Sequence, residues 1–303
     1  MGAIVTMRRR VLLHAMLCVL ALAGAGACRR AEAPPPVPAD VAGPRVVSLV
    51  PAATEMLFAV GAGPQVVGVS SFDKYPAEVA SRPRVGALLD PDVERILSLK
   101  PDLVITYASQ DSLHAQLTAA GIAQLEYRHG GIGDVLTTME EIGRQTGHEA
   151  EGRQAAQALR AQLTGVRMRV DARTRPKAVL VFGRDPGSVR QVWVSGGVGF
   201  LHELLDVAGA DNVFADVPRE NVQATTEMLL ARAPDVIIEL RAAIAGREAE
   251  SPWSALPGLP AVKSGRIIAL DGDRFVVPGP RLGDAAVDMA RALHPEAFAS
   301  QDR

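Results

Sequence analysis

A segment that occurs twice in this 303-residue chain constrains its fold more than any other feature. Residues 97–105 have the pattern of a helix end, a Pro-Asp turn and an apolar strand, and residues 230–238 repeat that pattern. In each half a β-branched run begins 55 positions before the proline of the turn, at Val46 and at Val179. Pro-Asp turns commonly link helix to strand, so one match alone carries little weight. Equal spacing in both halves favours two similar lobes.

The alternation of patterns within each half predicts the fold class. Short β-branched runs, such as 46–50 and 66–69, alternate with amphipathic stretches such as 54–60. This alternation is typical of α/β proteins whose strands are mainly parallel and buried on both faces. We therefore predict two Rossmann-like α/β lobes with mainly parallel sheets.

The segment between the lobes has a helical period. Apolar residues recur at intervals of three and four from Asp134 to about Thr174, and Gly147 and His148 divide this segment into two helices. The second helix ends before Pro176, because a proline disfavours helical continuation at the residue that precedes it. A single long α-helix thus joins the lobes, which makes a stiffer connection than a hinge of several loops.

The N-terminus predicts export. Arg8, Arg9 and Arg10 precede an apolar run that ends at Ala27, and this pattern is typical of a signal peptide. Small residues lead into Cys28, as in a bacterial lipobox, so we predict cleavage before Cys28 and lipidation of its sulfur. The alternative is an ordinary secretory signal with an incidental cysteine.

The mature chain has a tether and a folded body. Residues 28–44 are rich in proline and lack a hydrophobic period, which indicates an extended tether. Loss of three arginines with the signal lowers the net charge from −2 to −5, so no basic surface for nucleic acid is expected. The predicted divisions are a signal peptide (1–27), a lipidated tether (28–44), an N-terminal lobe (45–147), a connecting helix (148–175), a C-terminal lobe (176–298) and a tail (299–303).

Several ordered motifs resemble one family of receptors. They are Arg45-Val-Val-Ser-Leu-Val-Pro-Ala-Ala-Thr-Glu55, Val67-Gly-Val-Ser-Ser-Phe-Asp-Lys-Tyr-Pro76, residues 93–105, residues 199–214 and Pro280-Arg281. Together they resemble the cobalamin-binding and metal-chelate-binding solute receptors of ABC importers. The resemblance implies a class III periplasmic-binding-protein architecture and a monomer without enzymatic activity or a cofactor of its own. It also implies capture of cobalamin or a related corrinoid and delivery to an ABC permease and its ATPase.

Candidate ligand contacts follow the strands. Loops at the carboxyl ends of parallel strands collect in a crevice, and large flat ligands suit aromatic rings there. The chain has only 7 Phe, 2 Trp and 3 Tyr, yet four of these residues are predicted in strand-end loops. The candidate ligand-binding residues are Pro51, Phe72, Tyr107, Trp193 and Phe275, and the resemblance implies Asp273 as a further ligand contact. The resemblance also implies a tryptophan near Leu88 and an arginine near Val277, and both are missing.

The resemblance implies further sites and an alternative ligand. Receptors of this family dock on the permease through one acid on each lobe, and the matching positions are Glu94 and Asp206, with Glu203 as an alternative for the second. A ferric siderophore or heme is the alternative ligand. The tyrosine that heme receptors carry within the segment 85–89 is absent. The histidines show no metal-ligand spacing, so no metal site is predicted; His129, beside two glycines, is the one closest to a predicted cleft edge.

The sequence allows two alternative functions. An exported enzyme would use Ser195 as its nucleophile or residues 196–199 as a phosphate loop. However, Ser195 lacks the first glycine of a Gly-x-Ser-x-Gly elbow, and the chain has no Walker loop. A surface receptor that passes its ligand to an outer-membrane partner shares every feature except the recipient.

Overall fold

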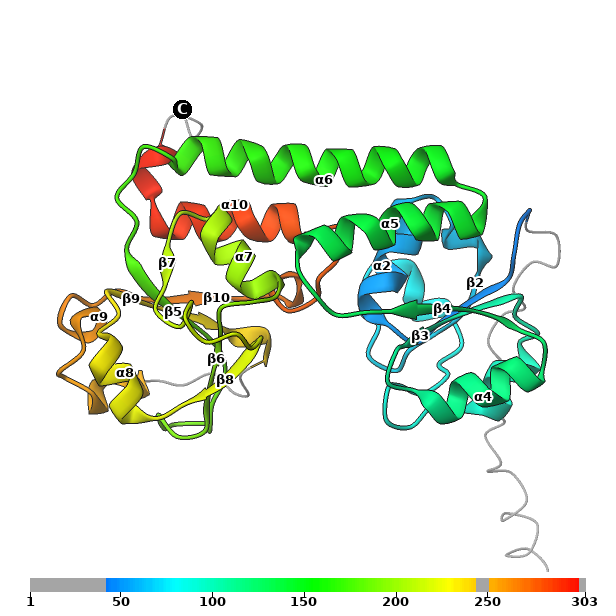
Figure 1. Cartoon of the computed structure of the whole chain (residues 1–303), viewed down its shortest axis with the longest axis horizontal. Coiled ribbons are helices and arrows are strands. Elements are labelled where there is room, and N and C mark those ends of the chain that lie inside the picture. The colour runs from blue at the N-terminus through cyan, green and yellow to red at the C-terminus, as the bar shows by residue number, and fades with distance from the viewer. Residues whose placement is uncertain (1–41, 244–250, 300–303) are drawn as a thin grey trace, which may run out of the picture. The chain divides into compact units, whose positions relative to one another are not determined.

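The computed structural model describes residues 42–243 and 251–299. The predicted signal peptide, Cys28, nearly all of the tether and most of the tail lie outside the described residues. The described chain forms two α/β lobes with the long helix α6 between them in sequence (Figure 1). The predicted fold class is confirmed. Across the described residues, no helix is both long enough and apolar enough to cross a membrane.

The N-terminal lobe contains an all-parallel sheet in the order β2-β1-β3-β4. Its β-branched residues are buried on both faces of the central strands, as a sheet covered by helices requires. The strands are β1 (Val46–Ser48), β2 (Val66–Val69), β3 (Leu103–Tyr107) and β4 (Ala123–Tyr127). The helices are α2 (Pro51–Ala59), α3 (Val93–Ser98), α4 (Asp111–Ala119) and α5 (Ile132–Thr146).

The C-terminal lobe contains a mixed sheet in the order β10-β9-β5-β6-β8, and β7 also pairs with β5. The strands are β5 (Lys177–Gly183), β6 (Val192–Ser195), β7 (Asp211–Asn212), β8 (Asn221–Ala224), β9 (Val236–Leu240) and β10 (Ile267–Leu270). The helices are α7 (Phe200–Val207), α8 (Thr226–Arg232), α9 (Pro260–Lys263) and α10 (Leu282–Leu293).

One part of the second sheet departs from the parallel pattern. Strand β6 runs antiparallel to β5 and to β8. The chain reverses after β5 in a turn in which Asp185 N–H donates to the Arg190 carbonyl at 2.9 Å. Such a short connection can only join antiparallel strands, because a parallel pair needs a longer crossover.

The repeated Pro-Asp turn has the same structural role in both lobes. Asp102 Oδ2 accepts a hydrogen bond from Arg45 N–H at 2.7 Å, just before β1. Asp235 Oδ2 accepts one from Lys177 N–H at 3.1 Å, at the start of β5. The backbone N–H of each aspartate also donates to the carbonyl of the same partner, at 2.9 and 2.8 Å. Each turn therefore aligns the start of a strand with its parallel neighbour, which explains the equal spacing.

Helix α6 (Glu149–Val170) lies beside α5 and α10 (Figure 1). It ends earlier than the sequence period predicts, and residues 171–176 are not helical. Its buried residues follow one face and are Gly152, Ala156, Leu159, Leu163, Val166 and Val170. All of them except Gly152 belong to a hydrophobic core that also contains residues of α2, α5, α7 and α10. The helical layer thus shares one core with the facing side of each sheet.

Candidate functional site

An exposed apolar patch lies on two neighbouring loops of the N-terminal lobe, which are joined where Ser71 N–H donates to the Gly86 carbonyl at 2.8 Å. It consists of Phe72, Tyr75, Leu88 and Leu89, whose exposed fractions are 68%, 47%, 38% and 93%. Grouped apolar side chains on a soluble protein commonly mark a binding surface. Sequence reasoning identified only Phe72. The two leucines lie where the resemblance implied a tryptophan. This part of the site is therefore apolar, as a tryptophan would make it, but it has no aromatic ring.

Polar side chains hold the two loops that carry this patch. Arg84 Nη1 donates to the carbonyls of Ser70 and Asp73, at 2.8 and 2.9 Å. Gln110 Nε2 donates to the Leu88 carbonyl at 3.0 Å, while its Oε1 accepts from the backbone N–H of Tyr107 at 2.9 Å. The apolar patch is therefore attached to the ends of β2 and β3 rather than to free loops.

Aromatic rings continue from the end of β3 toward the second lobe. Tyr107 packs edge-on against Tyr127 with 6.0 Å between ring centroids, and Tyr127 packs against His129 at 6.1 Å. His129 in turn packs against Phe200, the first residue of α7, at 5.6 Å. Burial raises the pKa of the Tyr107 hydroxyl, which stays neutral and able to donate a hydrogen bond. His129 is exposed, although it lies between two other members of this row.

A partly buried ion-pair cluster joins the two lobes. Arg281 precedes α10 and donates two hydrogen bonds to Glu55 of α2, to Oε2 at 2.9 Å and to Oε1. It donates a third to Asp273 Oδ1 at 2.8 Å, and its guanidinium lies 4.2 Å from the centroid of the Tyr75 ring. Burial raises the pKa of Glu55 and Arg281 opposes that rise, as a buried carboxylate paired with a cation should show. Asp273 was predicted as a ligand contact; the cluster around it was not.

Three other predicted ligand residues lie in different surroundings. Pro51 begins α2 and is partly exposed, where its missing N–H costs no hydrogen bond. Trp193 is 39% exposed but belongs to strand β6, with its ring against Gly183. Phe275 is fully buried in the shared core, because the short turn 273–275 directs Asp273 outward and Phe275 inward. Its ring offers no surface to a ligand in this structure.

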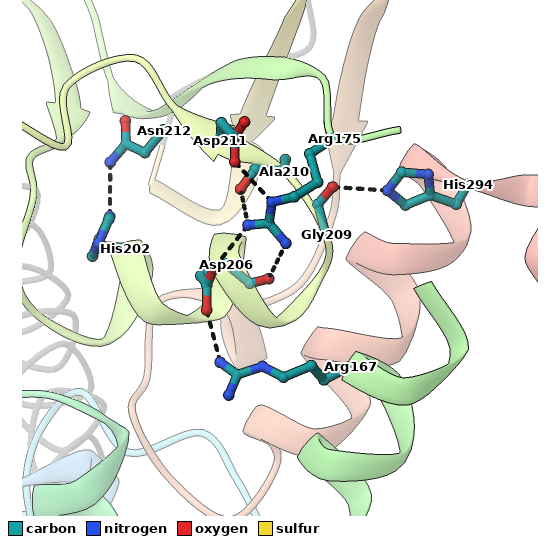
Figure 2. Close-up of polar contacts among 9 residues, drawn as sticks. All are labelled: Arg167, Arg175, His202, Asp206, Gly209, Ala210, Asp211, Asn212 and His294. Carbon is teal, nitrogen blue, oxygen red and sulfur yellow. Dashed lines mark hydrogen bonds and ion pairs between the residues drawn. The ribbon is translucent and has the colours of Figure 1, made fainter. Parts of the chain in front are cut away.

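The predicted docking acids also differ in their surroundings. Glu94 is exposed in the first turn of α3, after Asp92, which caps the helix by accepting from Arg95 N–H at 2.9 Å. Asp206 forms ion pairs with Arg167 and with Arg175, both at 2.7 Å (Figure 2). Its carboxylate is already satisfied within the protein.

Glu203, the alternative docking acid, is already hydrogen-bonded within the protein. Its Oε2 accepts a hydrogen bond from Ile132 N–H, the first residue of α5, at 2.7 Å. Phe200 N–H donates to the Gly130 carbonyl nearby, at 3.0 Å. Glu203 therefore links α7 of one lobe to α5 of the other.

The internal repeat identifies a different counterpart for Glu94. Asp235 lies 133 positions after Asp102, and Glu227 lies 133 positions after Glu94. Glu227 is exposed in the first turn of α8, and the side chain of Thr225 caps this helix by accepting from Met228 N–H at 3.3 Å. The two helices thus present a glutamate at the same position after the same kind of cap. Extending the repeat by one helix would have found Glu227 from the sequence.

The described residues give little support to metal binding or to a serine nucleophile. Among them, no group of three or more His, Cys, Asp or Glu side chains could hold a metal ion. Ser195 is fully buried, and its hydroxyl donates to the carbonyl of Gly196 at 3.2 Å. A nucleophile needs access to its substrate, so this serine has the surroundings of a structural residue.

Comparison with known proteins gives a consistent result. Residues 46–273 match the model of the family described as "Periplasmic binding protein". The uncharacterized ABC transporter substrate-binding lipoprotein YvrC of Bacillus subtilis is 32% identical over 84% of this chain and 81% of its own. The vitamin B12-binding protein of Salmonella typhimurium is 32% identical over 83% of this chain and 91% of its own. Among solved structures, the apo periplasmic heme-binding protein RhuT of Roseiflexus sp. RS-1 matches with a TM-score of 0.71 and 28% identity, over 84% of this chain and 99% of its own.

Proposed function

Because this chain belongs to the periplasmic binding protein family, we propose that it captures cobalamin or a related corrinoid outside the cytoplasm and delivers it to an ABC importer. The observation that carries the proposal is the pairing of an apolar patch with a fixed charged cluster at the strand ends. Phe72, Tyr75 and the two leucines offer apolar surface, while Asp273 and Arg281 offer charged groups. A corrin ring has an apolar face and an amide-bearing rim, so it needs both. The similarity to a vitamin B12-binding protein supports this ligand class.

Titration calorimetry tests the ligand directly. The mature chain carrying Cys28→Ser is titrated with cyanocobalamin, with hemin and with a ferric siderophore. We expect one-to-one binding of cyanocobalamin and a change in its absorption spectrum. Absence of binding by any corrinoid, together with tight binding of hemin or the siderophore, would refute the proposed ligand while leaving the receptor class intact.

Heme is the second candidate, and one side chain favours it. His129 is exposed between the rings of Tyr127 and Phe200, and an imidazole nitrogen is a good iron ligand. The similarity to a heme-binding protein adds support. If heme is the ligand, hemin should give a sharp Soret band that His129→Ala shifts; an unshifted band in that variant would exclude this histidine as ligand.

We also propose that Cys28 anchors the protein through lipid. The small residues before Cys28 and the proline-rich segment after it support this assignment, as does the lipoprotein name of the relative in Bacillus subtilis. Cys28→Ser should release the protein from membranes and leave ligand binding unchanged. Detergent partitioning of both forms decides the matter, and retention of the serine form in detergent contradicts the anchor.

For delivery, we propose Glu94 and Glu227 as the acids that contact the permease. Both are exposed, both lie in the first turn of a capped helix, and the repeat relates them to each other. One acid on each lobe facing cationic side chains would fix the orientation of the receptor on its partner. The ion pairs of Asp206 with Arg167 and Arg175 make it the weaker choice for this role.

A further inference from the structure

A buried acid lies within one of the two loops that carry the apolar patch. Asp73 is 3% exposed, although it follows Phe72 directly and precedes Tyr75 by two residues. Both of these rings are in the apolar patch. The loop 70–76 therefore has its aromatic side chains directed outward and one carboxyl group directed into the lobe.

The Asp73 carboxyl lacks a well-formed hydrogen bond within the described part of the chain. Both of its oxygens are buried and unpartnered. The Thr54 hydroxyl and the Ser70 N–H face this carboxyl and lower its pKa, but their effect is smaller than that of burial. An ionised carboxylate in this position is only partly compensated, whereas protonation removes the buried charge.

The charges around Asp73 do not complete that compensation. Arg84 is the nearby cation, but its Nη1 donates to two backbone carbonyls, including that of Asp73 itself. From α2, Glu55 adds a like charge that Arg281 already neutralises, and from β3 the neutral Tyr107 faces the same space. Burial consequently raises the pKa of Asp73 to about 7, with the effect of Glu55 in the same direction.

We propose that Asp73 is a proton-binding site that controls the loop carrying Phe72 and Tyr75, which is seated when the carboxyl is neutral and released when it ionises. Hydrogen bonds to the backbone hold this loop, so expelling a buried charge requires the loop to move with it. The link to ligand capture rests on the proposed function. The proton site itself does not.

The direction of the pH effect follows from the two protonation states. Asp73 keeps its proton in the native state up to a pH of about 7, whereas an unfolded chain loses it at about 4. The native state therefore binds more protons in this window, and its stability falls as pH rises from about 4 to about 7. Above that range the contribution of Asp73 no longer changes.

A carbon-13 NMR titration of the apo protein tests the proton site without any ligand. The Asp73 Cγ signal, assigned by through-bond correlation in the wild-type chain, should titrate near pH 7. The backbone amides of residues 70–76 should follow with the same midpoint and should stop titrating in Asp73→Asn. A Cγ midpoint near 4, amides that do not follow, or amides that still titrate in the variant would each overturn the proposal.

Cyanocobalamin affinity gives the second measurement. If only the protonated form is competent, the apparent Kd should rise about tenfold between pH 6 and pH 8. Asp73→Asn should keep its affinity within about twofold over that range, while the matched control Asp171→Asn, exposed after α6, should behave as wild type. An equal pH dependence in Asp73→Asn and wild type contradicts the coupling. Failure to bind at every pH would refute the ligand only, since the apo titration decides the proton site.

Discussion

The two lobes share their strand-aligning turns and helix caps, but they differ in the side chains that they contribute to the candidate site. Each has a Pro-Asp turn that aligns two parallel strands and a capped helix with an exposed glutamate. The N-terminal lobe presents the apolar patch, whereas Asp273 and Arg281 come from the C-terminal lobe. Strand pairing tolerates little change, while loops that leave the strands tolerate much. A repeated unit can therefore specialise its two copies through the loops alone.

Among the predictions, the largest expected change in stability comes from breaking the ion pair between the lobes. Glu55→Ala leaves the partly buried Arg281 with Asp273 as its remaining carboxylate partner, so the free energy of unfolding should fall by about 3 kcal/mol. The matched control is Glu149→Ala, which removes an exposed i,i+4 pair with Arg153 and should cost less than about 0.5 kcal/mol. Urea unfolding of both variants gives the comparison. Equal losses would show that the inter-lobe pair contributes no more than a surface pair.

The apolar patch lies on the N-terminal lobe and is exposed. A substitution in it should therefore lower the affinity for the ligand without lowering the stability of the protein. Phe72→Ala should weaken cyanocobalamin binding about tenfold, equivalent to about 1.4 kcal/mol. The unfolding free energy should change little, because the ring is 68% exposed. Phe275→Leu is the control, since its buried ring should affect stability and leave affinity nearly unchanged. The reverse pattern would place Phe275 in the site and remove Phe72 from it.

Because the Pro-Asp turn has the same role in both lobes, removing its aspartate should lower the free energy of unfolding by a similar amount in each lobe. Asp102→Ala and Asp235→Ala each remove one hydrogen bond to a backbone N–H at the start of a strand. Each should lower the unfolding free energy by about 1 kcal/mol, with the two values close to each other. Urea denaturation measures both. A loss in one lobe only would mean that the repeat is a sequence resemblance without a common structural role.

The smallest expected effect on ligand binding concerns the two exposed glutamates. Glu94→Ala and Glu227→Ala should leave cyanocobalamin affinity within about twofold, because remote surface changes typically alter stability by less than about 0.5 kcal/mol. Uptake through the cognate importer should nevertheless fall, and Arg substitutions should lower it further through like-charge repulsion. Asp206→Ala is the comparison variant. If it impairs uptake and Glu227→Ala does not, Asp206 is the docking acid as the resemblance implied.

The sequence by itself determined the α/β class, the two lobes and the helix between them, because periodicity and turn residues act over short distances. Local patterns also located Phe72 and Tyr107 at strand ends. They could not reveal that Phe275 faces the core, since one turn of backbone reverses the direction of a side chain.

Only the tertiary structure decided which charged groups are partners. Arg281 and Glu55 are 226 positions apart, and Asp206 meets Arg167 and Arg175 from 39 and 31 positions away. Nothing local in the chain encodes such a pair, because its energy depends on the burial and geometry that packing creates. The same holds for Asp73, which looks like any loop aspartate until the fold buries its carboxyl without a well-formed hydrogen bond.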